Sequence, residues 1–329
     1  MRIRLCLSVI GLAGSIAVIA AQSPAAPPGA ALVVGSGNFF SPIVANLDKA
    51  VAFYRDGLGL EVMGAPSNAA ENAPLRNMFG LPDAGLRWTV ARRPGLRNGV
   101  EIVEITNAGG KPLDRRITDP GAMTLVMSSP DDLDQVVARL REHGGTMVSA
   151  PGKPDVGGRA RVLVTRDADD HFVQLFEAGA TAAPLPPRIR LTVQSVTKSV
   201  ALYRDALGLR PPAGSPVSDD VLMTALGIAR GGASTAALEV PRSGLVVEFI
   251  EFKTNGRKVV GRIQDPGSTR LQLQVRDLDA AVQAVVRAGG HVVSTGGRPV
   301  ELPGGRGSSI KAAIVQDPDN LFLVLIQAS

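Results

Sequence analysis

The residues best suited to chemistry are charged and amide side chains that alternate with apolar residues in short segments. Arg188 and Arg190 lie in RIRLTV, Glu248 lies in LVVEFIE, and Arg270 and Gln272 lie in RLQLQV. Successive side chains of a β-strand point to opposite faces, so the polar residues of each segment share one face. Guanidinium groups hold carboxylates or phosphates through paired hydrogen bonds. These segments predict a polar, cationic cleft in which Arg188 and Arg270 converge on Glu248.

Two interpretations of this cleft remain open. The arginines pair with Glu248 as a buried scaffold, since buried charges are nearly always paired, or they keep donors free to bind a small anion. A second set of candidate residues combines an apolar side chain with hydrogen-bonding groups: Phe39, Glu101, Thr124 and Gln174. This second set suits an uncharged organic molecule. Alternatively, its side chains fill a collapsed cup.

An internal duplication supplies the elements that position these residues. Four motifs recur in the same order: LDKAVAFYRDGLGL and VTKSVALYRDALGL, RITDPGAMTL and RIQDPGSTRL, DLDQVVARLREHGG and DLDAAVQAVVRAGG, RDADDHFVQL and QDPDNLFLVL. Motifs that recur in the same order at a fixed spacing indicate a repeated architecture. The sequence predicts one domain over 37–180 and a second over 188–329, joined by a proline-rich linker over 181–187.

Each repeat alternates between strand and helix patterns. Ile189, Leu191 and Val193 recur at every second position, which is typical of a strand with one buried face. Apolar residues at helical spacing predict a helix over 198–207, and the glycine of LGL ends it. The same order of a strand pattern followed by a helix pattern recurs from residue 270 onward. We therefore expect an α+β fold with two strand–helix–strand modules in each repeat, forming cupped mixed sheets.

The motifs resemble those of the vicinal oxygen chelate superfamily, which includes glyoxalase I, bleomycin resistance proteins and extradiol dioxygenases. The resemblance rests on ANLDKAVAFYRDGLGLEV with DADDHFVQLFE, and on ALYRDALGL with QDPDNLFLVLI. It covers almost the whole chain from Gly37 onward. It implies two tandem domains, each made of two βαβββ modules. It also implies a divalent metal that is held by His and Glu side chains and polarises vicinal oxygens of a substrate.

Most of the metal-ligand positions implied by this resemblance hold other residues. Those that open and close the strands fall on Phe39, Arg188, Thr124, Arg270, Gln174 and Val324. Only Glu101 and Glu248 remain as carboxylates. We therefore expect no cofactor and a protein that binds a small organic or anionic molecule. One alternative is a divalent-metal lyase, isomerase or ring-cleaving dioxygenase, and another is a structural or partner-binding module with closed clefts.

The remaining reactive residue types offer little support for catalysis. His143, His171 and His291 have no second ligand at a suitable spacing, so they are expected at the surface or as caps. Trp88 is expected in the core. The one cysteine, Cys6, lies in the N-terminal segment, so a mature chain would contain no thiol for disulfides, zinc or nucleophilic catalysis.

The composition and the N-terminus bear on location. The chain has 329 residues, of which 45% are apolar and 4% aromatic, and a formal net charge of +5 without basic runs, which argues against nucleic-acid binding. Arg2 and Arg4 precede an apolar run, so residues 1–21 predict a secretory signal and 22–36 a flexible tether. We expect an exported, periplasmic or extracellular protein. The alternative is a membrane anchor over residues 5–21, and the oligomeric state is left open.

Overall fold

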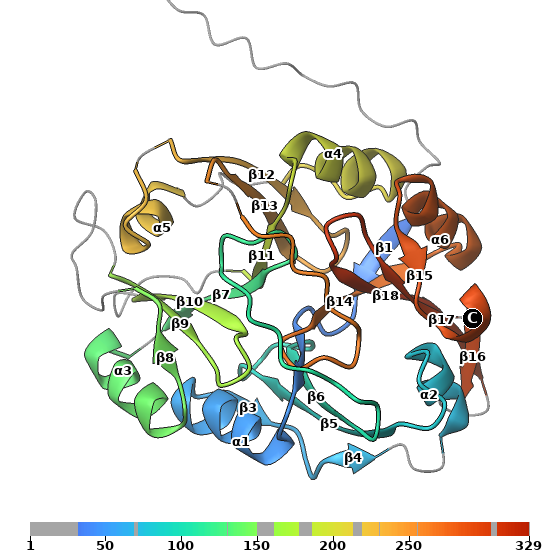
Figure 1. The fold of residues 1–329 in the computed structure, drawn as a ribbon, viewed down its shortest axis with the longest axis horizontal. Coiled ribbons are helices and arrows are strands. Elements are labelled where there is room, and N and C mark those ends of the chain that lie inside the picture. Colours follow the sequence, from blue (N-terminus) through green and yellow to red (C-terminus); the bar gives the residue numbers. More distant parts are fainter. Residues whose placement is uncertain are drawn as a thin grey trace, which may run out of the picture.

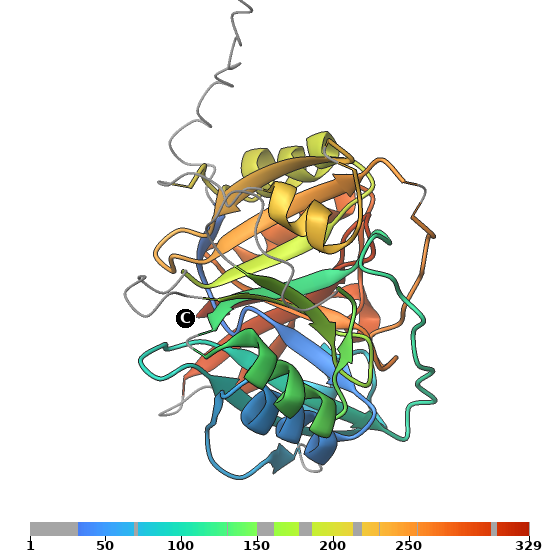
Figure 2. The ribbon, with the colours of Figure 1, turned by 90° about the vertical axis from the view of Figure 1, so that its left-hand side faces the viewer.

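The computed structural model describes residues 32–68, 72–129, 131–149, 161–177, 186–212, 219–229, 231–254, 256–303 and 308–328. The predicted signal and nearly all of the predicted linker lie outside these residues. Mixed sheets occupy the middle of the molecule and helices lie around them, as the two views in Figures 1 and 2 show, so the expected α+β class is confirmed. Within the described ranges, no helix is long and apolar enough to cross a membrane.

The first repeat contains these elements: β2(Ser41–Val44), α1(Leu47–Ala52), η1(Phe53–Gly57), β3(Glu61–Val62), β4(Ser67–Asn68), α2(Ala73–Met78), β5(Gly85–Arg92), β6(Val100–Thr106), β7(Met123–Ser129), α3(Leu133–Glu142), β8(Thr146–Met147), β9(Val162–Arg166) and β10(Phe172–Glu177). The second repeat contains β11(Arg188–Thr192), α4(Val196–Val200), η2(Ala201–Ala206), α5(Asp219–Ala225), β12(Ala233–Glu239), β13(Val246–Phe252), β14(Thr269–Val275), α6(Leu278–Arg287), β15(His291–Val292), η3(Thr295–Gly297), β16(Val300–Pro303), β17(Ser309–Gln316) and β18(Phe322–Ala328). β1(Val33–Ser36) precedes the first repeat: the last residues of the segment predicted as a flexible tether form a strand that pairs with β14.

Each sheet is built from both repeats. The larger sheet has the order β15-β17-β18-β14-β2-β6-β5-β3, with β1, β4 and β16 at its sides, and the smaller has the order β12-β13-β11-β7-β10-β9-β8. The repeats meet where β14 runs antiparallel to β2, pairing Arg270 with Ser41, and where β11 runs antiparallel to β7, pairing Arg190 with Thr124. The first module of one repeat therefore shares a sheet with the second module of the other.

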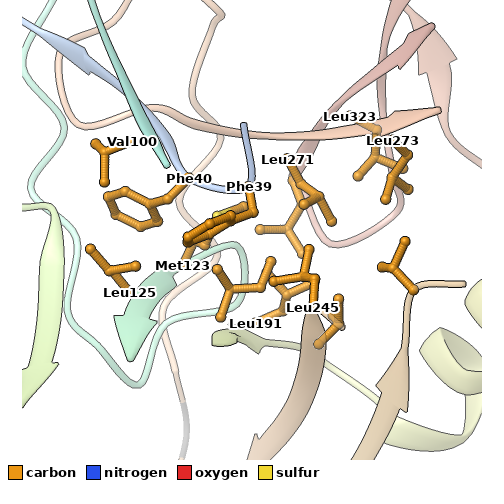
Figure 3. Packing of buried hydrophobic residues seen from close by; sticks show 14 of the residues in the cluster. Phe39, Phe40, Val100, Met123, Leu125, Leu191, Leu245, Leu271, Leu273 and Leu323 are labelled. Carbon is orange, nitrogen blue, oxygen red and sulfur yellow. The ribbon is translucent and has the colours of Figure 1, made fainter. Parts of the chain in front are cut away.

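The main apolar core lies between the two sheets. Figure 3 shows Phe40 and Leu271 of the larger sheet close to Leu125 and Leu191 of the smaller one. These four side chains are at most 3% exposed. The alternation of apolar and polar residues along the strands places one face of each sheet in this core. The opposite faces carry the polar residues that the sequence analysis selected.

The repeated FYRD and LYRD motifs tie the helices to the closing turns. The predicted helix over 198–207 is observed as α4 running directly into the π-helical segment η2. Its Tyr203 hydroxyl donates a hydrogen bond to Asp317 at 2.8 Å, and the Tyr54 hydroxyl donates to Asp167 at 3.4 Å. Because each tyrosine and its aspartate belong to different modules of one repeat, these bonds link the two sheets.

The two DPG turns join the repeats to each other. Asp119 accepts hydrogen bonds from the backbone N–H of Arg116 within its own turn and from that of Arg257 in the other repeat, both at 2.8 Å. Asp265 likewise accepts from the N–H of Lys111 at 2.9 Å. Carboxylates that satisfy backbone donors in this way fix the chain just before β7 and β14 begin. These strands carry several of the candidate site residues.

Candidate ligand site

A polar group of three side chains forms the floor of the concave face of the larger sheet. Arg270 and Gln272 come from β14, and Glu101 comes from β6. The Arg270 Nη2 donates to Glu101 Oε2 at 3.0 Å, and the Gln272 Nε2 donates to the same oxygen at 2.7 Å. Gln272 Oε1 accepts from the N–H of Asn38 at 3.1 Å. We call this face the larger cup.

Arg270 is held by electrostatic contacts on two sides. Its guanidinium lies 4.7 Å from the centroid of the Phe79 ring, a cation–π geometry, and its side chain is 1% exposed. Burial lowers the pKa of Arg270, while the charge of Glu101 and its hydrogen bond oppose this change. An arginine nevertheless remains protonated near neutral pH. Arg270 and Glu101 therefore form a pair without net charge in which the guanidinium is buried and the carboxylate is partly exposed.

Apolar side chains form the walls above this floor. They enclose a cavity of about 230 Å³ lined by Leu75, Met78, Phe79, Leu86, Trp88, Val103, Leu302, Val324 and Ile326. Helix α2 supplies Leu75 and Met78, and β16 supplies Leu302. Apart from Val324 and Trp88, these wall residues were not predicted from the sequence, although Asn72 before an apolar helical segment was a usable N-cap signal. Trp88, expected in the core, is only partly buried and lines the cavity.

The smaller sheet carries a more deeply buried polar cluster. Arg188 and Arg190 both contact the carboxylate of Glu248, with Arg190 Nη2 lying 2.7 Å from Glu248 Oε2. Arg190 also donates to Gln174 Oε1. All four residues are at most 5% exposed, as is Thr124 beside them. Leu222 and Met223 of α5 belong to an apolar cluster that includes Phe172 and Ile250 of this sheet.

The predicted convergence on Glu248 is confirmed for Arg188 and wrong for Arg270. Glu248 meets Arg188 and Arg190, whereas Arg270 meets Glu101 in the other sheet. The physical reason is the exchange of modules between repeats, which places β11 beside β7 and β14 beside β2. The candidate residues are thus divided by sheet and not by repeat.

Phe39 does not face the cleft as expected. The chain bends before β2, and the Phe39 N–H donates to the carbonyl oxygen of Gly99 at 3.1 Å. This bend interrupts the strand alternation on which the expectation rested. The ring is 6% exposed and lies among the residues between the sheets, as Figure 3 shows. Ser41 contacts the floor of the larger cup instead, since Gln272 Nε2 lies 3.4 Å from its hydroxyl.

His171 is buried, contrary to the expected surface or capping position. Its ring Nδ1 lies 2.9 Å from Asp167 Oδ2, and its Nε2 lies 3.2 Å from the carbonyl oxygen of Ser268. Burial lowers the pKa of His171, but the charge of Asp167 and the hydrogen bond to it outweigh burial and leave the pKa raised. His143 follows α3 as its C-cap, as expected.

The residues of the larger cup do not fit a divalent metal. Its one carboxylate, Glu101, already accepts from the Arg270 guanidinium, which carries the same sign of charge as a metal ion. Val324 has no ligand atom, and guanidinium groups do not coordinate cations. Across the part of the chain that the structure describes, no three His, Cys, Asp or Glu side chains are grouped to hold a metal ion.

Comparisons with known proteins identify related sequences and folds. The model of the Glyoxalase/Bleomycin resistance protein/Dioxygenase superfamily matches residues 38–175 and 186–325. Glyoxalase I from Zea mays is 18% identical, with a TM-score of 0.57 over 88% of this chain and 92% of that one. A putative dioxygenase from Bacillus subtilis is 12% identical, with a TM-score of 0.50 over 91% and 86% of the two chains. A search of curated proteins found no match.

Proposed function

Because the chain belongs to the Glyoxalase/Bleomycin resistance protein/Dioxygenase superfamily, we propose that it is a metal-independent binding protein for a small organic molecule. The observation that carries the proposal is the cavity of about 230 Å³ above Glu101, Arg270 and Gln272. Mostly apolar walls with a few convergent polar groups are the usual construction of a ligand site. The ligand would rest against the apolar walls and direct its polar group to the floor.

The floor favours an uncharged ligand over an anion. Arg270 is already neutralised by Glu101, so an anion would meet no net positive charge and would approach the carboxylate. A group that both donates and accepts hydrogen bonds, such as an amide, can instead donate to Glu101 and accept from Arg270 at the same time. The cavity is smaller than the roughly 300–1,000 Å³ of typical sites for drug-sized ligands. We infer a small amide-like or hydroxyl-bearing aromatic or aliphatic compound.

Benzamide and benzoate provide a direct test, because they have the same shape and differ in charge. Benzamide is expected to raise the melting temperature more than benzoate at equal concentration. A ligand at a hundred times its Kd stabilises the folded state by about 2.7 kcal/mol. Arg270→Met should abolish this shift, whereas Arg141→Gln, an exposed substitution on α3, should retain it. Equal shifts in wild type and Arg270→Met would contradict binding at this floor.

The absence of a metal requirement is a separate part of the proposal. We expect elemental analysis of protein purified without chelators or a metal-affinity column to give less than about a tenth of an equivalent of Fe, Mn, Zn or Ni, since one guanidinium-bound carboxylate is a poor ligand set. Near-stoichiometric metal would favour the alternative of a metal-dependent lyase, isomerase or dioxygenase.

We also propose that the protein is exported. Support comes from the basic residues Arg2 and Arg4 before the apolar run, followed by small residues at Ala20 and Ala21. N-terminal sequencing of the cell-envelope fraction should find a mature chain that starts between Ala21 and Ser23. A start at Met1 together with detergent-dependent extraction would instead support the membrane-anchor alternative.

A further inference from the structure

A second cavity, of about 680 Å³, opens between elements of the two repeats. It lies between the β5–β6 loop, the β12–β13 turn and the neighbouring strand β1. Its lining includes Ser36, Phe39, Arg97, Asn98, Arg242 and Leu245. We call it the seam cavity. It shares no lining residue with the larger cup, so it is a separate candidate site.

The seam cavity carries positive charge from both repeats. Arg97 lies on the β5–β6 loop and Arg242 on the β12–β13 turn, and both are exposed. Within the described residues, neither guanidinium forms an ion pair with a carboxylate. Arg93 lines an adjoining cavity, where its Nη1 donates to the hydroxyl of Ser128 at 3.0 Å. Guanidinium groups without carboxylate partners, set around a concave surface, attract anions.

The lining of the seam cavity also contains apolar side chains. Phe39 and Leu245 lie behind the surface of the cavity, since they are 6% and 1% exposed and belong to the core between the sheets, as Figure 3 shows. The apolar surface of the cavity is presented by the partly buried residues Val34, Leu96 and Pro187. An inorganic ion would leave this apolar surface uncovered. An amphipathic anion would cover it and gain roughly 25 cal/mol for each Å² of apolar surface removed from water.

We propose that the seam cavity binds a small organic anion whose apolar body rests on Val34, Leu96 and Pro187 and whose acidic group meets Arg97 and Arg242. This site is independent of the function proposed for the larger cup. Its ligand class is also different, because the larger cup has a neutral floor and the seam cavity has unneutralised guanidinium groups.

The backbone suggests how to remove the charge without disturbing the turn. Arg242 has a φ of 59°, in the left-handed region, which asparagine adopts more readily than most residues. Arg242→Asn therefore deletes the guanidinium and suits the turn, and Arg97→Gln deletes the other charge at an exposed loop position. Arg141→Gln on α3 is a matched control, because it removes an exposed arginine that does not line the cavity.

The test is a fluorescence titration with 8-anilinonaphthalene-1-sulfonate, an apolar dye with one negative charge, excited directly. Wild type and Arg141→Gln should show one saturable site that weakens as salt is added. The double variant Arg97→Gln/Arg242→Asn should bind at least about tenfold more weakly and lose the salt dependence. Unchanged melting temperature and circular dichroism would show that this double variant is folded.

Three results would contradict the proposal. Equal dye affinity in the folded double variant and in wild type would show that the arginines do not hold the anion. Loss of dye binding in Arg270→Met would place the dye in the larger cup. A competition experiment distinguishes the contribution of the acidic group from that of the apolar body. Decanoate should displace the dye, and inorganic phosphate at the same concentration should not. Displacement by phosphate alone would contradict the role of Val34, Leu96 and Pro187.

Discussion

Glu101 and Glu248 occupy equivalent places in the two repeats but have different surroundings. The Glu101 side chain is 19% exposed beside a cavity and meets Arg270, whereas the Glu248 side chain is 5% exposed and meets two arginines. Burial decides what each carboxylate can do. Water or a ligand can reach Glu101, while Glu248 serves internal pairing. The same residue type therefore supports a binding site in one sheet and a scaffold in the other.

Substitution of the two glutamates should separate these roles. Glu248→Gln removes the carboxylate that Arg188 and Arg190 both contact, and breaking a buried pair in this way typically costs about 3–5 kcal/mol. Glu101→Gln keeps an oxygen acceptor for Arg270 beside the cavity, so we expect a loss of roughly 1–2 kcal/mol. Urea unfolding measures both changes in free energy. Equal losses would contradict the assignment of Glu248 to the scaffold.

At the scale of the elements, a Tyr–Asp hydrogen bond in each repeat joins the first helix to the closing turn. The residues around the two hydrogen bonds differ. Asp167 lies against His171, whose raised pKa favours the positively charged ring. Asp317 has Leu321 at the place equivalent to His171. Burial, together with the charge of Asp319, raises the pKa of Asp317 from 3.8 to about 7. The second repeat thus buries a carboxyl group that retains its proton at mildly acidic pH.

This difference predicts that stability falls as the pH rises. Between about pH 4 and 7 the unfolded chain releases the proton of Asp317 while the folded chain retains it, so the free energy of unfolding decreases over this window and then levels off. The raised pKa of His171 acts in the same direction, because its contribution is lost as the pH rises through the folded pKa. The Asp317 effect is on the order of a few kcal/mol.

Chemical denaturation from pH 5 to 8 provides the measurement. Asp317→Asn should flatten most of the decline below pH 7, because an amide does not titrate. Asp83→Asn, at an exposed position, should leave the decline unchanged. A decline of the same size in Asp317→Asn and in wild type would show that Asp317 is not the group responsible.

At the scale of the whole molecule, each sheet combines the first module of one repeat with the second module of the other, so neither repeat forms a complete sheet by itself. The β14–β2 and β11–β7 junctions hold both sheets together. An isolated repeat would expose these strand edges and part of the apolar core. We expect residues 32–180 and 181–329, expressed separately, not to form folded monomers, and to copurify one to one when coexpressed. A monomeric half that melts cooperatively would contradict this expectation.

The sequence predicted the repeats and the strand face on which each side chain lies, but it did not predict which side chains contact each other across neighbouring strands. The motif order predicted the α+β class and the tandem domains, and the alternation in RIRLTV and RLQLQV predicted which side chains share a face. Alternation does not specify which strand lies alongside, so Arg270 was assigned to the wrong glutamate. It also fails at a bend, as at Phe39. The burial of His171 depends on Ser268, which is distant in sequence.

The measurement that tests the central claim most directly is the emission of Trp88. This is the one tryptophan of the chain, and it lines the larger cup, so its fluorescence reports on that cavity alone. Titration with benzamide in the presence of a strong chelator should give a saturable change in Trp88 emission that is absent in Arg270→Met. Because binding is metal-independent, the curve should be the same with and without the chelator. A change that appears only after a divalent metal is added would contradict metal-independent binding.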